Sequence, residues 1–310
     1  MVEPYTGGDP MSEQRWLNCR LTDIAEALDE TQCVSTPVIS RLLQQHHYRL
    51  RVNHKTIEST AGHPDRNQQF EYLHQQRAAH QAAGQPTLSL DTKKKELIGN
   101  FKNAWRIWSQ QPEAVNVHDF PNDAVGRAVP YGIYDLQQNR GHVYVGQSAD
   151  TPEFAVDNLA RWCETEMPQF YPNADRLFLE ADCGGSNGVR CRLWKQQLQE
   201  KICDRFGLTV TVCHYPTGCS KWNPIEHRLF SEISKTWAGC PLRSYDIMLK
   251  YLGETKTQTG LTVQATLVST DYAKGIHVSD ETMATLNVQV HDICPQWNYT
   301  ITPRSHQMPN

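Results

Sequence analysis

The stretch Arg176–Gly188, RLFLEADCGGSNG, joins a short apolar strand to a glycine-rich corner. Alternation along the strand places Asp182 on the same face as Phe178 and Glu180. α/β sheets usually place ligands at the carboxyl ends of their strands, and glycines let a bulky or phosphorylated partner approach the backbone closely. Because Asp before Gly-Gly is also ordinary turn chemistry, the stretch indicates a ligand site only together with the rest of the chain.

The composition is that of a soluble globular protein. The chain has 310 residues, a hydrophobic fraction of 39% and a mean hydropathy of -0.60. No apolar run approaches the length of a membrane span, and the amino terminus, MVEPYTGGDP, has no basic-then-apolar signal region. We therefore expect a cytoplasmic, nucleoid-associated protein whose ten cysteines are reduced thiols.

The charge balance argues against a protein whose whole surface binds nucleic acid. The net charge is -4, from 30 Lys and Arg against 34 Asp and Glu. Local basic faces are compatible with this balance. One cluster, Lys93–Lys95, lies beside Asp91, and another begins at Arg190 after the glycine corner. A solvated helix face is the alternative interpretation of either cluster.

The amino-terminal part is predicted to be helical. Residues 20–30 carry apolar side chains at helical spacing, and a second helix opens near Ser35 with Pro37 in its first turn. Its expected buried stripe is Val38, Leu42 and Leu43, which leaves Arg41 exposed. Two short helices of this kind resemble a helix-turn-helix with a recognition helix, although any small helical bundle gives a similar pattern. Residues 63–84 indicate a long polar connecting helix.

The remaining pattern predicts a mixed α/β fold. A strand at 85–91 ends on Asp91, and a helix or bent strand is expected around 97–108. A hairpin at 131–137 and 142–147 follows, and alternating helices and strands come after it. These are a helix capped by Thr151, the strand ending on Asp182, a helix at 189–206, a strand at 208–215 and a helix opening at Asn223. An antiparallel meander feeding βα units predicts a ribonuclease-H-like, mixed five-stranded sheet with flanking helices.

Three regions are expected from this order. Residues 1–84 form a helical, helix-turn-helix-like DNA-binding region with its connector. Residues 85–255 form the ribonuclease-H-like catalytic domain. Residues 256–310 contain several short strand-like pieces and are expected to form a small β-rich extension.

Three carboxylates occupy comparable positions in the predicted fold. Asp91 and Asp182 each close a strand, and Glu226 lies one turn into the last helix. Hard oxygen ligands suit Mg²⁺, and two such ions can activate an attacking hydroxyl and stabilise the leaving oxygen at a phosphodiester. Such a site needs no shifted carboxylate pKa, because the metals supply the electrostatics.

Each of these acids has a structural alternative. Asp91 could be a turn residue before Lys93, and Glu226 matches a capping box with Asn223. Spacing does not exclude three rival acids, which are Glu96, Asp135 and Glu180.

Other chemistries fit the sequence less well. A zinc site would use Cys213, His214, Cys219 and His227, but their spacing fits no usual pattern and strand neighbours point to opposite faces. A Cys–His hydrolase built on Cys183 or Cys219 is unsupported, since a free Cys is usually a small buried hydrophobe.

Several long motifs resemble one family. They are HPDRNQQFEYL, PTLSLDTKKKELIGNF, VPYGIYDLQQNRGHVYVG, DTPEFAVDNLARW, ADCGGSNGVRCRLWK and SKWNPIEHRLFSEI. They are similar to bacterial insertion-sequence transposases of the Rhodopirellula-transposase type, which carry a ribonuclease-H-like DDE domain. The likeness runs from about Val2 to Ile301.

The resemblance implies a polynucleotidyl transferase that hydrolyses DNA at the element's ends and uses the freed 3′-hydroxyl to attack target DNA. Its acid triad falls on Asp91, Asp182 and Glu226, which would hold two Mg²⁺ ions, with Mn²⁺ as a substitute. The implied partners are transposon-end DNA, target DNA and further copies of the chain. Candidate DNA-binding residues are Arg41, Lys93, Lys94, Lys95, Arg190 and Lys221.

The chain departs from the family pattern in places. Pro216-Thr217-Gly218-Cys219 replaces the usual Pro-Pro-Gly-Thr, and Thr236 stands where Asn is common; neither change touches a proposed ligand. Family members usually carry further helical sequence ahead of this chain's beginning. One alternative is therefore a truncated, non-catalytic remnant that binds element ends as a regulator. Another is a general nuclease of the same fold.

Overall fold

The computed structural model describes residues 6–8, 15–17, 19–29, 33–51 and 63–304. The chain divides into two compact units, residues 1–59 and 60–310. Among the described residues, no helix is both long and apolar enough to cross a membrane.

The first unit contains a short hairpin and two helices. Strands β1 (Thr6–Gly8) and β2 (Arg15–Leu17) pair antiparallel, and helices α1 (Leu21–Asp29) and α2 (Thr36–Gln45) pack together. Both helices were predicted, but the predicted stripe of α2 is wrong at Leu42, whose exposed fraction is 45%. Ile39 is buried instead. Arg41 is exposed, as expected.

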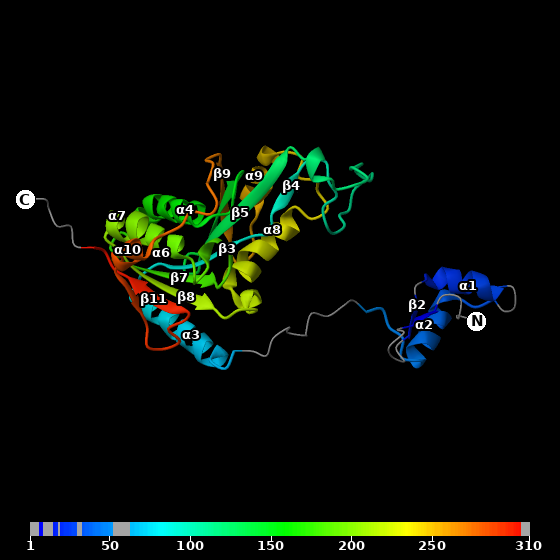
Figure 1. Cartoon of the computed structure of the whole chain (residues 1–310). Helices are drawn as coiled ribbons and strands as arrows, with labels where there is room; N and C mark the ends of the chain where they lie inside the picture. Colours follow the sequence, from blue (N-terminus) through cyan, green and yellow to red (C-terminus); the bar gives the residue numbers. More distant parts are fainter. Residues whose placement is uncertain (1–5, 9–14, 18, 30–32, 52–62, 305–310) are drawn as a thin grey trace, which may run out of the picture. The chain divides into compact units, whose positions relative to one another are not determined.

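The second unit is built on a mixed sheet. The central strands are β3 (Thr87–Thr92), β5 (Gly126–Asp135), β6 (Arg140–Gly146), β7 (Arg176–Asp182) and β8 (Thr209–Tyr215), in the order β6-β5-β3-β7-β8. β5 is antiparallel to β3 and β6, whereas β3, β7 and β8 are parallel. A hairpin feeding parallel βα units is the predicted ribonuclease-H-like arrangement, and the topology confirms it (Figure 1).

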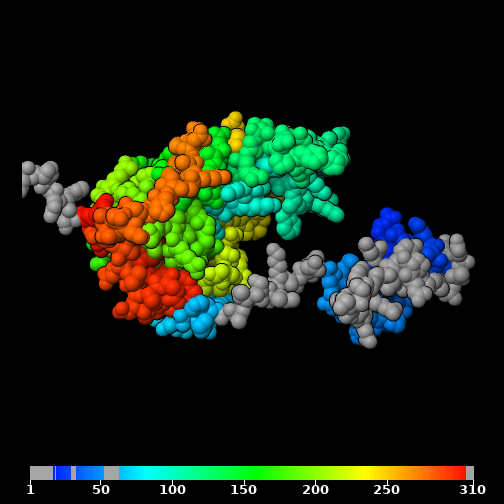
Figure 2. All heavy atoms as spheres, viewed as in Figure 1, coloured from blue at the N-terminus to red at the C-terminus, as the bar shows by residue number. Residues whose placement is uncertain are grey.

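The carboxyl-terminal strands extend this sheet at both edges. β9 (Thr262–Val268) pairs parallel with β6, while β11 (Asn298–Ile301) pairs antiparallel with β8 and carries β10 (Val288–Val290). With β4 (Glu96–Ile98) on β5, the described part of this sheet has nine strands. The boundary expected at 255/256 therefore falls inside the second compact unit, and in Figure 2 the orange and red segments are continuous with its surface.

Helices cover both faces of the sheet. On one face, α4 (Pro152–Thr165) and α6 (Arg192–Leu198) bury Leu88, Leu179 and Val212 in the largest apolar core. On the other face, α8 (Ser231–Thr236) and α9 (Tyr245–Glu254) form a second core with β5, β6 and β9. Three further helices are short: α5 (Met167–Phe170), α7 (Asp204–Phe206) and α10 (Asp280–Ala284).

The polar helix α3 (Arg66–Ala82), which was expected to be a connector, packs against the sheet as part of the second unit. Leu73 packs with Phe178 and Cys213 of β7 and β8, and the Gln69 amide donates to the His214 carbonyl at 2.9 Å. The boundary expected at 84/85 therefore also lies inside this unit. Burial of a Gln and a Leu one turn apart explains why a helix of low apolar content docks here.

Two local predictions need correction. Of the helix or bent strand expected around 97–108, only the first two residues are extended, within β4; after β4 the chain runs irregularly, with the Gly99 amide donating to the Leu242 carbonyl at 2.8 Å. The helix predicted at 189–206 begins only at Arg192, because the glycine corner includes a 3-10 turn at Gly185–Asn187. The cap of α4 is confirmed, since the Thr151 hydroxyl accepts from the Phe154 amide at 3.2 Å.

Gly132 of β5 determines how closely the segment 225–230 approaches the sheet. It lies opposite Asp91 in the β3–β5 pair. A Cβ atom added at Gly132 would lie 2.6 Å from the Phe230 ring and 2.8 Å from the Ile225 side chain. Both residues flank Glu226 in sequence, so the bare backbone at Gly132 allows the segment carrying Glu226 to dock.

We expect Gly132→Ala to lower the free energy of unfolding by about 1–3 kcal/mol, because an added methyl overpacks this contact. Gly253→Ala is the matched control: this exposed glycine of α9 has nothing within 4 Å of an added Cβ. Urea denaturation of both variants measures the difference. Equal stability of the two variants would contradict the packing argument.

Candidate active site

Asp91 and Asp182 lie at the carboxyl ends of neighbouring parallel strands. The β3–β7 register pairs Leu90 with Ala181, so each acid is the next residue along its strand. Leu90 and Ala181 both belong to the larger core, and alternation therefore turns both acids toward the opposite face of the sheet. Both carboxylates are partly buried.

Glu226 reaches this face from the segment that follows β8. Pro224 and Ile225 open a helical turn, and Glu226 begins a π-helical segment that ends at Phe230. The Ile225 amide donates to the Ser89 hydroxyl of β3 at 3.1 Å, which ties the start of this segment to the central strand.

Asn223 locks the junction between the strands and this segment. Its side chain is fully buried and its amide donates to the Leu90 carbonyl at 3.3 Å and to Asp182 Oδ1 at 3.2 Å. Its carbonyl oxygen accepts from the Ser89 hydroxyl. The Asn223 backbone N–H donates to the Ser220 carbonyl at 2.9 Å, so Glu226 is not needed to cap it. The capping-box alternative for Glu226 therefore fails.

The charges of the three carboxylates affect one another. Burial is the largest cause that raises the pKa of Asp91 to about 8, and the charges of Asp182 and Glu226 and a hydrogen bond with Glu226 contribute to this rise. The pKa of Asp182 is raised to about 6, because burial and the Glu226 charge raise it more than the Asn223 hydrogen bond lowers it. Like charges crowded in a partly buried place are typical of functional sites.

The rival acids are engaged elsewhere. Glu180 is fully buried and forms a two-point ion pair with Arg77 of α3, at 2.5 and 2.7 Å. Asp135 lies at the far end of β5, where it accepts the Tyr171 hydroxyl at 2.8 Å and the Gln137 amide at 2.9 Å. Glu96 pairs with Lys93 at 3.2 Å.

A cavity of about 440 Å³ opens beside Asp91 and Asp182. Its lining adds Asp150, which the sequence argument missed: Asp150 accepts the Thr92 hydroxyl at 3.2 Å and pairs with Lys95 at 3.5 Å. Asn187 was also missed; it accepts the Tyr131 hydroxyl at 3.0 Å. Asp150 precedes a helix cap, so its sequence context indicates only a helix start.

The proposed DNA-binding residues separate into two groups. Lys94, Lys95, Arg190 and Lys221 are exposed on the second unit, and Arg41 is exposed on the first. Lys93 differs from them: it is buried, its ammonium lies 4.8 Å from the centre of the Trp237 ring, and it pairs with Glu96. Lys93 also lines the cavity that contains Asp91 and Asp182, so it stays a candidate for DNA contact.

The zinc alternative does not survive in the described residues. His214 is fully buried, and its Nδ1 lies 2.9 Å from the Asp182 carbonyl, which can only accept. Nδ1 therefore carries the proton and supports the backbone of Asp182. The Cys219 thiol accepts from the Arg66 guanidinium at 3.3 Å.

The donor set is suited to a hard cation, although among the described residues no three His, Cys, Asp or Glu side chains are arranged to hold an ion. The acids supply oxygen donors, which Mg²⁺ prefers. Burial first, and neighbouring carboxylates second, raise the pKa values of Asp91 and Asp182, and a bound divalent cation would offset both effects.

These raised pKa values predict a pH dependence of stability without divalent metal. The folded state binds protons at Asp91 and Asp182 more tightly than the unfolded chain does, so these groups make the fold less stable as pH rises from about 4 to about 8. Asp91→Asn should make this decline shallower and raise the free energy of unfolding at pH 8. Urea denaturation in chelator across this window measures it.

Asp175→Asn is the control, because that carboxylate is 71% exposed at the amino end of β7. If the free energy of unfolding changes with pH equally in Asp91→Asn and the wild type, the raised pKa of Asp91 is contradicted.

The ion pair with Arg77 indicates that Glu180 has a structural role. Arg77→Met would leave the Glu180 carboxylate buried without its cation, at a cost of about 3–5 kcal/mol in the free energy of unfolding. Adding Glu180→Gln should recover part of the loss. Arg176→Met, at a side chain 61% exposed, should change stability by about 0.5 kcal/mol or less. A loss no larger in Arg77→Met than in Arg176→Met would overturn this assignment.

Comparisons with known proteins bear on the whole chain. The family model described as Rhodopirellula transposase DDE domain matches residues 1–303. A comparison with curated proteins gives no match. Among solved structures, the Mos1 transposase paired-end complex with left transposon end is 14% identical, with 76% of this chain and 70% of that chain covered and a TM-score of 0.46. The Mos1 mariner paired end complex with Mn is 16% identical, with 76% and 66% covered and a TM-score of 0.47.

Because these TM-scores lie below 0.5, the family assignment rests on the family model, which covers nearly the entire chain. Its description agrees with the ribonuclease-H-like sheet and with the acids gathered at the ends of its strands. The chain therefore belongs to the Rhodopirellula transposase DDE domain family, a family of transposases.

Proposed function

We propose that this transposase hydrolyses DNA at the ends of its element and joins the freed 3′ ends to target DNA. The observation that carries the proposal is the convergence of Asp91, Asp182 and Glu226 from three separate elements onto one face of the sheet. In the first step, water attacks the phosphorus and the 3′ oxygen leaves with a proton. In the second step, that 3′-hydroxyl attacks a target phosphodiester and displaces another 3′ oxygen.

Asp91, Asp182 and Glu226 would hold divalent cations, for which Mg²⁺ is the expected ion and Mn²⁺ a substitute. Two such ions, when bound, activate the attacking hydroxyl and stabilise the leaving oxygen. The protein's part is to hold the acids in place. The Thr92 amide donates to Asp91 Oδ1 at 2.7 Å, and Asn223 holds Asp182 Oδ1.

Exposed cations around the acid cluster would position the DNA backbone. Lys94 and Lys95 line the same cavity as Asp91 and Asp182, and Lys221 lies on the turn that leads into the Glu226 segment. Contacts to phosphate fix the register of a duplex without reading its sequence. Arg41 on α2 is the candidate for contacts that recognise the element's ends.

Joining two ends to one target favours a homo-oligomer on DNA, which we include in the proposal. The buried hydrogen bonds of Asn223 and the crowded acids support catalysis over the non-catalytic alternative, because a binding-only remnant needs neither.

The test is nicking and joining of duplexes that carry the element's ends, in Mg²⁺ or Mn²⁺. We expect Asp182→Asn to reduce both steps by about 10²–10³-fold, which is the usual cost of losing one group that stabilises transition-state charge. Asp175→Asn, an exposed acid before the first residue of the same strand, should retain activity.

Equal activity of wild type and Asp182→Asn would contradict the assignment of this acid. Binding of the ends by the wild type without any nicking would favour the non-catalytic regulator.

A further inference from the structure

A second, larger cavity borders the acid cluster. Its volume is about 1090 Å³, and Gly184 and Gly185 line both this cavity and the one that contains Asp91 and Asp182. A Cβ atom added at either glycine would meet nothing within 4 Å, so open space adjoins the backbone there. A chain-like ligand bound at the acids can therefore continue over this corner into the larger cavity.

Two cations face this cavity without a carboxylate partner. Arg190 is exposed, and Lys195 is partly buried with its ammonium 4.9 Å from the centre of the Tyr299 ring. No Asp or Glu is among the described residues that line the cavity, and no ion pair within 4.0 Å involves either cation in the described part of the chain. Because a partly buried charge without a partner is costly, Lys195 favours an anionic ligand, which the exposed Arg190 could also contact. Burial also lowers the pKa of Lys195.

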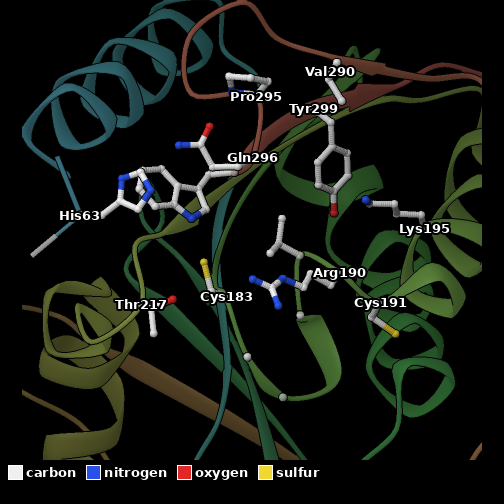
Figure 3. A pocket seen from close by; sticks show the side chains of 15 residues that line it. His63, Cys183, Arg190, Cys191, Lys195, Thr217, Val290, Pro295, Gln296 and Tyr299 are labelled. Atoms are coloured by element: carbon white, nitrogen blue, oxygen red, sulfur yellow. The ribbon is translucent and has the colours of Figure 1, made fainter. Parts of the chain in front are cut away.

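The opposite side of the cavity offers a flat ring and an amide. The His63 side chain is 47% exposed and packs edge-on against Trp297, with ring centroids 4.7 Å apart. Gln296 donates its amide to Asp65 at 3.0 Å, which leaves its carbonyl oxygen as an acceptor. Figure 3 shows Arg190 and Lys195 pointing into the opening across from His63 and Gln296.

We propose that this cavity binds one nucleotide of the DNA strand, unpaired from its duplex, next to the phosphodiester held at the acid cluster. The inference rests on the proposed function and names how the same site holds its substrate. Arg190 and Lys195 take the phosphate, and the base lies against His63 with its edge near Gln296. The shared corner at Gly184 and Gly185 carries the strand between the two cavities.

The size of the cavity favours a nucleotide over a lone phosphate. Sites for drug-sized molecules occupy roughly 300–1,000 Å³, and the volume of this cavity slightly exceeds that range. Stacking on aromatic side chains is a sequence-tolerant way to hold an unpaired base. A free nucleotide has the same phosphate and ring, so the experiment must separate it from a nucleotide within a strand.

The experiment measures binding, not turnover. Duplexes carrying the element's end receive a single mismatch at successive positions around the cleavage site, and their affinities for the wild-type protein are measured by fluorescence anisotropy in Ca²⁺ at fixed salt. A mismatch removes the cost of unpairing the base. We expect a mismatch at one position to tighten binding by about tenfold and mismatches elsewhere to have little effect.

Four variants assign the effect to the cavity. Arg190→Ala and Lys195→Met should abolish the mismatch gain. Their controls are Arg176→Ala, at the amino end of β7, and Lys250→Ala, on the exposed face of α9, which should keep it. Circular dichroism and thermal unfolding check that each variant folds. The mismatch scan on the wild type is decisive even if Lys195→Met does not fold.

Three results would overturn the inference. One is a wild-type scan with no favoured position, and another is a gain that Arg190→Ala and Lys195→Met retain. The third is tight calorimetric binding of free dAMP or dTMP that end DNA does not displace, which would assign the cavity to a small molecule. Nicking of the ends by the wild type separates these results from failure of the proposed function, because nicking persists when only the cavity assignment is wrong.

Discussion

The buried side chain of Asn223 is the contact on which the arrangement of this site depends. It links β3 through Ser89 and Leu90, β7 through Asp182, and the segment that carries Glu226. Because these bonds are buried, losing one partner would leave polar atoms unsatisfied, so the three elements are held in one register. Gly132 completes the junction by leaving room for Phe230 against β5.

Two acids two residues apart on β7 illustrate how environment assigns roles. Glu180 and Asp182 share a face of the strand, and a sequence reading cannot separate them. Glu180 meets the Arg77 guanidinium and the Tyr215 hydroxyl, so its charge is compensated within the protein. Asp182 meets Asn223 and two further acids, and its charge remains available to a cation. The difference comes from helix α3, which covers only one of them.

The glycine corner after β7 serves two neighbouring cavities. On one side are acids that suit cations, and on the other are cations that suit phosphate. One cavity thus favours cations and the other favours anions, and the two lie only a few residues apart along the backbone. Such a pair of cavities suits a DNA strand, which carries several phosphates and needs metal ions at only one of them. His214 supports this corner through both ring nitrogens. Its Nδ1–H donates to the Asp182 carbonyl, and its Nε2 lies 3.3 Å from the hydroxyl of Tyr299, which lines the larger cavity.

The sequence by itself determined the order of the strands along the chain, the cap at Thr151, and the two strand ends that carry Asp91 and Asp182, because alternation and turn chemistry are local. Only the tertiary structure decided what depends on distant contacts. Glu226 faces the two Asp residues because Asn223 and Gly132 fix its segment, and Lys93 is buried because Trp237 and Glu96 enclose it. Asp150 enters the cavity from a loop with no motif, and the carboxyl-terminal strands join the sheet edges through pairings that no local pattern specifies.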